Sequence, residues 1–119
     1  MPGNVLERTE RALHDLDANA LVSLYADTFL FEDTSAGLRI ETKQALKEYF
    51  DSLFAWPNVK FSDVRFFGMG DRGAGQWTWQ GTSRQTGAPF LIRGASLFRL
   101  TGSTIAEEII FYDPRKAYA

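Results

Sequence analysis

From Asn58 to Tyr112, apolar side chains recur at every second position, and three short glycine-containing turns interrupt the pattern. A period of two is typical of β-strands with one buried face, and short turns join antiparallel neighbours. The pattern predicts four long antiparallel strands, at Val59–Phe67, Ala74–Arg84, Phe90–Leu100 and Thr104–Tyr112. Because long strands joined by hairpins twist strongly, we expect this sheet to curl and to present a concave face.

The first half of the chain has a helical period instead. Asn4 and Glu7 have the spacing of a capping box at the start of a helix. A polar tail is expected after Asp113 and Pro114. Three helices packed on a mainly antiparallel sheet make an α+β fold, and 119 residues fit a single domain, 1–119. The expected helices are Val5–Leu16, Ala20–Tyr25 and Lys43–Phe54, with short strands at Thr28–Asp33 and Leu38–Glu41.

The composition excludes several classes of function. The chain has no cysteine, which excludes disulfides and thiolate chemistry, and its single histidine cannot form a multi-histidine metal site. The formal net charge of −2 argues against a nucleic-acid surface. No apolar run reaches the length of a membrane span, and the N-terminus lacks the apolar segment of a signal peptide. We therefore expect a soluble, cytoplasmic protein that binds neither nucleic acid nor membrane and needs no cofactor.

The short strand that ends at Asp33 contains the best candidate for a chemical group. Phe29, Phe31 and Asp33 fall on one face of this strand, which places a carboxylate in line with two phenylalanines. In an apolar pocket the charged form of a carboxyl group loses hydration, and a pKa raised toward neutral suits a general base. The alternative is a turn carboxylate that accepts backbone N–H groups from Ser35 or Ala36.

The order of elements resembles the NTF2-like fold, in its SnoaL-like and ketosteroid-isomerase-like branch. Three segments carry the resemblance, Leu13–Asp33, Ala45–Pro57 and Phe98–Tyr112. The resemblance implies a cone in which three N-terminal helices pack on a strongly curved, mainly antiparallel sheet around a ligand pocket. The general-base aspartate of ketosteroid isomerase falls on Asp33, whereas its two oxyanion-hole positions hold Thr9 and Ser96. The base position therefore matches, and the oxyanion positions do not.

Trp77 and Trp79 share a strand face that the same overlay turns inward. Two indoles at positions i and i+2 make a flat apolar wall suited to a ring-shaped ligand. Ser96 is expected to donate a hydrogen bond into the pocket, and for all these residues the alternative is ordinary core packing. The rest of the lining is expected from Phe31, Tyr49, Trp56, Phe98 and Tyr112.

Glu108 falls on the inward face of the last expected strand, where it is a candidate for a second acid/base group opposite Asp33. A register slip of one residue would turn Glu107 inward instead, because alternate residues of a strand face opposite sides. A strand end in water is a further alternative. The sequence leaves these readings open.

The opposite, convex face of the sheet combines apolar residues with two arginines. Such a face is too apolar to be left in water. The resemblance implies that it forms a two-fold homodimer, which requires one self-complementary patch on each subunit. The residues concerned are Leu91, Arg93, Ala95, Leu97, Arg99, Ile109 and Phe111.

Three functions are compatible with these features. The first is an enzyme of the isomerase or cyclase type, in which Asp33 moves a proton on a small apolar, cyclic carbonyl compound bound against the two tryptophans. The second is a non-catalytic binder with the same apolar pocket. The third is a dimeric assembly module whose pocket has no role of its own.

Overall fold

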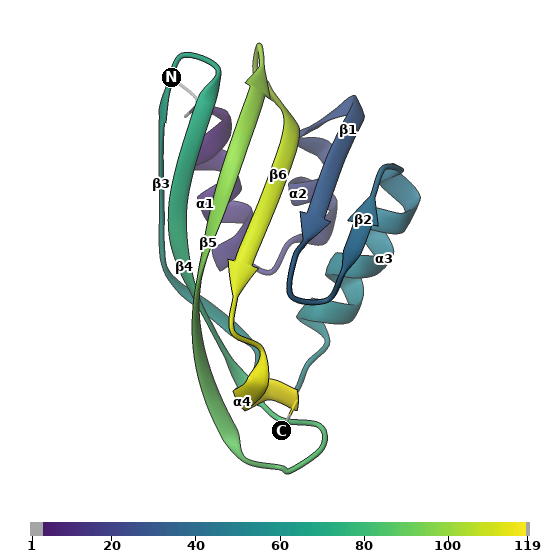
Figure 1. Ribbon diagram of the computed structural model, residues 1–119, viewed down its shortest axis with the longest axis vertical. Helices are drawn as coiled ribbons and strands as arrows, with labels where there is room; N and C mark the ends of the chain where they lie inside the picture. Colours follow the sequence, from purple (N-terminus) through teal and green to yellow (C-terminus); the bar gives the residue numbers. More distant parts are fainter. Residues whose placement is uncertain (1–3, 119) are drawn as a thin grey trace.

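Six strands form one curved, unclosed sheet in the computed structural model, which describes residues 4–118 (Figure 1). The strand order across the sheet is β2-β1-β6-β5-β4-β3. β1 pairs with β6 in parallel, and the other neighbours pair antiparallel. The mixed α+β fold predicted from the sequence is therefore confirmed. The strands are β1 Tyr25–Asp33, β2 Leu38–Ile40, β3 Lys60–Met69, β4 Arg72–Thr82, β5 Pro89–Thr101 and β6 Thr104–Tyr112.

The predicted meander of four long strands is present as β3 to β6. β6 has the predicted bounds, and the ends of β3, β4 and β5 differ from the predicted ones by one or two residues. Gly70, Gly87 and Gly102 lie in the three hairpin turns with φ angles of 61°, 72° and 58°. Only glycine reaches this left-handed region at little cost, so these residues fix where the strands reverse.

Three helices precede or interrupt the strands, and local capping sets where they begin. They are α1 Val5–His14, α2 Ala18–Ser23 and α3 Lys43–Phe54. The predicted capping box at Asn4 and Glu7 is present at the start of α1. α1 ends at His14, two residues earlier than predicted, because Leu16 has a left-handed φ of 56°.

The prediction of a helix at Ala20–Tyr25 was shifted along the chain. Asp17 caps α2 by accepting a hydrogen bond from the backbone of Ala20 at 3.0 Å, so the helix begins at Ala18. Tyr25 belongs to β1, where its partner in the parallel pairing is Ile105 of β6. The Tyr25 side chain therefore enters the core from a strand and not from the end of a helix.

A short fourth helix, α4 Arg115–Tyr118, replaces the predicted polar tail. Ala117 is fully buried, and its carbonyl oxygen accepts a hydrogen bond from Ser83 Oγ at 2.9 Å. The tail is therefore packed against the end of β4, a contact that the polar composition of the segment did not reveal. Helices α1, α2 and α3 lie together on one face of the sheet (Figure 1). No helix within residues 4–118 is long and apolar enough to cross a membrane.

Candidate functional site

A cavity of about 310 Å³ lies between α3 and the concave face of the sheet. Strands β1, β4 and β6, together with helices α3 and α4, contribute most of its lining. Two carboxyl groups, Asp33 and Glu108, line it, and within residues 4–118 no lysine, arginine or histidine does. The aromatic residues of the lining are Phe31, Tyr49, Phe50, Trp56, Phe61, Trp77, Trp79, Tyr112 and Tyr118.

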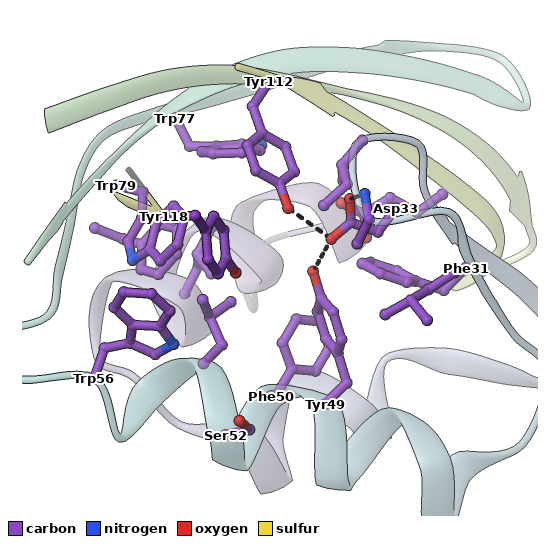
Figure 2. A pocket seen from close by; sticks show the side chains of 17 residues that line it. Phe31, Asp33, Tyr49, Phe50, Ser52, Trp56, Trp77, Trp79, Tyr112 and Tyr118 are labelled. Carbon is purple, nitrogen blue, oxygen red and sulfur yellow. Dashed lines mark hydrogen bonds between the residues drawn. The ribbon is translucent and has the colours of Figure 1, made fainter. Parts of the chain in front are cut away.

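Asp33 lies at the end of β1 and is only 1% exposed. Its Oδ2 atom accepts hydrogen bonds from the hydroxyls of Tyr49 and Tyr112, each at 2.8 Å (Figure 2). Its Oδ1 atom accepts from the backbone N–H of Ala36 at 3.0 Å. The turn contact with Ala36 is therefore present on one oxygen, and the other oxygen faces two tyrosines of the cavity wall. Three hydrogen bonds hold the carboxyl group of Asp33 in place.

The two tyrosines that contact Asp33 remain protonated donors. Burial raises the pKa of Tyr49 well above its usual value, and the adjacent Asp33 adds to the effect. Burial and the hydrogen bond to Asp33 also raise the pKa of Tyr112. Both phenols therefore hold their protons throughout the physiological pH range, and their O–H groups remain directed at Asp33.

Glu108 is 7% exposed and faces the cavity from β6, where it lies beside Phe31 of β1 and Phe98 of β5. Ser96 Oγ donates to its Oε2 at 2.8 Å, and the hydroxyl of Tyr25 donates to its Oε1. Burial raises the pKa of Glu108 to about 7, although both hydrogen bonds act in the opposite direction.

The preceding residue of β6, Glu107, settles which glutamate faces inward. Glu107 is partly exposed, and its Oε1 lies 4.0 Å from Nε of Arg99, which is exposed. The inward position of Glu108 is therefore correct, and the register slip that would turn Glu107 inward does not occur. Arg93 and Arg99 are exposed on the opposite face of the sheet, as predicted.

Trp77 lies flat on the neighbouring strand β5. A Cβ atom at Gly94, its partner in the register, would lie 2.2 Å from Cη2 of the indole, so the ring covers the bare backbone there. Figure 2 shows this indole edge-on at the sheet side of the cavity. Its Nε1 donates to Ser96 Oγ at 3.0 Å, which makes a continuous chain of hydrogen bonds from Trp77 through Ser96 to Glu108.

Two residues that were predicted to line the cavity lie elsewhere. Ser96 is fully buried and links Trp77 to Glu108 beneath the cavity wall, so its hydroxyl is already bonded on both sides. Phe98 packs against Phe66 in the core, with ring centroids 5.0 Å apart, and does not line the cavity. An inward-facing strand position guarantees burial, but only the curvature of the sheet decides whether the side chain reaches the cavity.

Sequence reasoning missed several residues of this region, among them Phe50 and Phe61 in the lining, Tyr25 and Tyr118. Tyr25 was assigned to a helix end, whereas the structure places it in β1, before a register shift in the pairing with β6. Tyr118 lies in α4 and packs edge to face on Trp56, at 5.4 Å between centroids. No periodicity is readable in a helix of four residues, so the sequence carried no comparable signal for Tyr118.

The lining has few groups that could bind a phosphate-bearing cofactor. Phosphate-bearing cofactors need cationic side chains or a cluster of backbone N–H groups, and no cationic side chain within residues 4–118 lines the cavity. In the same part of the chain, no three His, Cys, Asp or Glu side chains are grouped as a metal ion would require. The chemistry available here is that of two carboxyl groups and their tyrosine, serine and tryptophan neighbours.

Comparison with known families agrees with this architecture. Residues 6–108 match the family of SnoaL-like domains. The chain belongs to the SnoaL-like family. A search of the curated proteins finds no match for this SnoaL-like protein.

Solved structures that resemble this SnoaL-like protein share its NTF2-like fold at low sequence identity. A ketosteroid-isomerase-like protein from Catenulispora acidiphila, described in complex with trimethylamine, is 19% identical, with a TM-score of 0.81 over 95% of this chain and 88% of that one. A protein provisionally named polyketide cyclase from Pseudomonas putida is 15% identical, with a TM-score of 0.81 over 97% and 96%. An NTF2-like protein from Burkholderia thailandensis is 17% identical, with a TM-score of 0.81 over 98% of each chain. At such identities the likeness extends to the fold alone.

Proposed function

We propose that this SnoaL-like protein is a cofactor-independent enzyme that transfers protons on a small, apolar, cyclic carbonyl compound, with Asp33 as the base. The observation that carries the proposal is the presence of two carboxyl groups in different surroundings on the wall of one aromatic cavity. Two titratable groups whose surroundings favour different protonation states can act as base and acid at the same pH.

Asp33 is suited to the role of base. A carboxylate offers about four acceptor sites, and the three observed donors leave one of those on Oδ1 free. The two tyrosine hydroxyls fix the position of the carboxylate. A base held in place in this way loses little entropy when it meets its substrate.

Glu108 is suited to the role of acid. Since its pKa is about 7, a large fraction of the side chain carries a proton at neutral pH. Glu108 lies opposite Phe31 in the parallel pairing, so Asp33 is its diagonal neighbour on the adjacent strand. Both groups can therefore reach neighbouring atoms of one small ligand.

The proposed proton transfers involve no net gain or loss of protons by the protein. Asp33 takes a proton from the carbon next to the carbonyl group, and protonated Glu108 gives its proton to the resulting enolate oxygen. In a substrate with a double bond next to the α-carbon, the enol is a conjugated dienol. Return of the enol proton to Glu108, with transfer of the Asp33 proton to the far carbon of the dienol, shifts the double bond and completes an isomerisation. Both carboxyl groups then have their starting forms, and no other reactant is consumed.

The volume and the aromatic lining of the cavity suit the proposed substrate class. A volume of about 310 Å³ accommodates a molecule of one to three rings, and indole and phenyl groups provide flat apolar contact. Two carboxyl groups and the lack of cationic lining within residues 4–118 disfavour an anionic substrate.

Deuterium uptake by 2-tetralone in D₂O tests the proposal, since its α-protons are labile enough to report a modest catalyst. We expect the wild-type protein to accelerate uptake, and Asp33→Asn to lower the acceleration by about 100-fold or more. Glu108→Gln should lower it by about 10-fold or more. Asp27→Asn, an exposed carboxyl group on the same strand, is the matched control and should leave the rate unchanged. Uptake equal to the uncatalysed rate in the wild type would refute the enzymatic function.

A non-catalytic binder is the second candidate, because three of the acceptor sites of Asp33 are already occupied. The C. acidiphila protein, described with trimethylamine bound, supports small-ligand binding by this fold. Binding of 2-tetralone that changes tryptophan fluorescence, without any acceleration of deuterium uptake, would favour this second function over the first.

A further inference from the structure

The indole of Trp77 presents a whole ring face to the cavity. A Cβ atom at Gly94 would lie 2.2, 2.5 and 2.6 Å from three atoms of its six-membered ring, so one face of the indole rests on β5. Trp77 lines the cavity, and Figure 2 shows the opposite face of the indole turned toward it. Because the face of an aromatic ring is negatively polarised, it attracts cations, and indole does so more strongly than phenyl or phenol.

The aromatic cluster already holds a cation on its outer side. The guanidinium carbon of Arg84 lies 4.8 Å from the ring centroid of Trp56, which is a cation–π contact. Arg84 is exposed and does not line the cavity. Among residues 4–118, no lysine, arginine or histidine lines the cavity to make the same contact from inside. The inner ring faces are therefore open to a cation that a ligand brings.

Both carboxyl groups of the cavity are close to Trp77. Ser96 links Trp77 to Glu108 by hydrogen bonds of 3.0 and 2.8 Å. Tyr112 links Trp77 to Asp33, because its ring centroid lies 5.8 Å from that of Trp77 and its hydroxyl donates to Asp33 at 2.8 Å. A positive charge over the indole is thus near two acidic side chains, and the attraction acts through space without direct contact.

The hydrogen bonds of these carboxyl groups indicate which kind of cation fits. Asp33 already accepts three hydrogen bonds and Glu108 accepts two. A primary ammonium group carries three N–H donors, and each of them needs an acceptor when it leaves water. An alkylated ammonium group spreads its charge over C–H groups and has one N–H donor or none. The cavity therefore suits an alkylated ammonium better than a primary one.

We propose that the ligand of this cavity carries a tertiary or quaternary ammonium group, which lies over the inner face of Trp77 near the carboxyl groups of Asp33 and Glu108. The inference rests on the proposed function in taking the ligand to be a small ring compound, and it adds a positive charge to that compound. A volume of about 310 Å³ accommodates a ring together with a trimethylammonium group.

The test compares phenyltrimethylammonium with tert-butylbenzene, which has the same shape and no charge. Binding is followed by tryptophan fluorescence. An apolar cavity without preference for positive charge would bind the neutral compound about 10-fold or more tighter, because the cation loses its hydration on entry. We expect the cation to bind at least as tightly as tert-butylbenzene. Tighter binding of the neutral compound, or no binding of the cation, would overturn the proposal.

A pH titration of the wild type gives a second measurement. The charge of phenyltrimethylammonium does not change with pH, so any change in its affinity comes from the protein. Because burial raises the pKa of Glu108 to about 7, this side chain gains a negative charge between pH 6 and pH 8. Tyr25 and Tyr49 beside it hold their protons, since burial raises the pKa of both well above the usual value.

The affinity for the cation should therefore rise by about 3- to 10-fold from pH 6 to pH 8, and that for tert-butylbenzene should stay constant. Glu108→Gln should abolish the rise. Glu107→Gln is the matched control, because it removes a partly exposed carboxyl group on the other face of β6, and it should keep the rise. A constant affinity for the cation in the wild type would contradict a charge near Glu108.

Trp77→Leu tests the place of the cation. It removes the ring face, so it should weaken phenyltrimethylammonium by about 10-fold and tert-butylbenzene by less. Equal weakening of both compounds would refute the place over Trp77. If this variant does not fold, the two wild-type measurements still decide whether the cavity selects a cation.

These outcomes are separate from that of the deuterium experiment, because binding is measured without turnover. A protein that exchanges deuterium into 2-tetralone but prefers tert-butylbenzene to the cation would lose the ammonium site alone. A protein that selects the cation and does not accelerate exchange would lose the enzymatic function and keep the ammonium site.

Discussion

At the scale of single residues, the two carboxyl groups of the cavity differ in the donors that replace their hydrogen bonds to water. Asp33 receives hydrogen bonds from two tyrosines and a backbone N–H group, whereas Glu108 receives them from Tyr25 and Ser96. At Glu108 the cost of burying the charge exceeds what its two donors return, so the protonated form persists to about pH 7. The two carboxyl groups therefore differ in the donors that surround them.

Glu108 should make the stability of the fold depend on pH. Its pKa is about 7 when folded and near 4.5 when exposed in the unfolded chain. Between these values the unfolded chain releases its proton and the folded protein retains it, so the free energy of unfolding falls as pH rises. We expect wild type to lose about 2 to 3 kcal/mol relative to Glu108→Gln between pH 5 and pH 8, measured by urea unfolding.

The neighbouring glutamate provides the control for this pH dependence. Glu107→Gln removes a partly exposed carboxyl group from the same strand, so its pH profile should follow that of the wild type. A constant difference between wild type and Glu108→Gln across this range would show that burial does not hold the proton on Glu108.

At the scale of secondary-structure elements, β4 and β5 build the flat wall of the cavity together. Trp77 on β4 can lie flat only because its partner on β5 is Gly94, which has no side chain. The indole then covers the strand and reaches Ser96, two residues further along β5. One glycine thus sets both the orientation of the ring and its link to Glu108.

Gly94→Ala should displace the Trp77 ring, since a Cβ atom there would lie 2.2 Å from the indole. We expect a cost of about 1 to 3 kcal/mol in the free energy of unfolding. The near-UV circular dichroism of the tryptophans should change as well. In a Trp77→Leu background the same substitution should cost much less, and an equal cost in both backgrounds would contradict the packing described here.

At the scale of the whole molecule, the two faces of the sheet differ in what covers them. Helices cover the concave face, whereas the convex face carries Leu91, Leu97 and Phe111 at 49%, 50% and 45% exposure. Leu97 lies opposite Ile109 in the register, and Phe111 lies opposite Ala95, which makes a continuous apolar patch. We propose that a second copy of the chain covers this patch in a two-fold dimer.

Leu97→Glu tests the dimer by placing a charge at the centre of the patch. Light scattering coupled to size exclusion should give about twice the chain mass for wild type and the mass of one chain for the variant. Because Leu97 is half exposed in the single chain, the variant should keep its fold, which circular dichroism can check. A monomeric wild type would refute the dimer without affecting the cavity.

The sequence by itself determined the meander, α3 and the inward face of β1, because strand alternation, turn glycines and helix caps act over a few neighbouring residues. It therefore placed Asp33 and Glu108 on the side of the sheet where the structure has them. It also gave the fold class, since the order of elements leaves few ways to cover the sheet.

Tertiary structure alone decided which inward side chains meet. Tyr25 bonds to Glu108 across 83 positions of sequence, and Tyr112 bonds to Asp33 across 79. Tyr118 joined the cavity through α4, whereas Phe98 stayed in the core. Strand alternation gives the face of a residue but not its depth, which depends on the curvature of the sheet and on the distant helices packed against it.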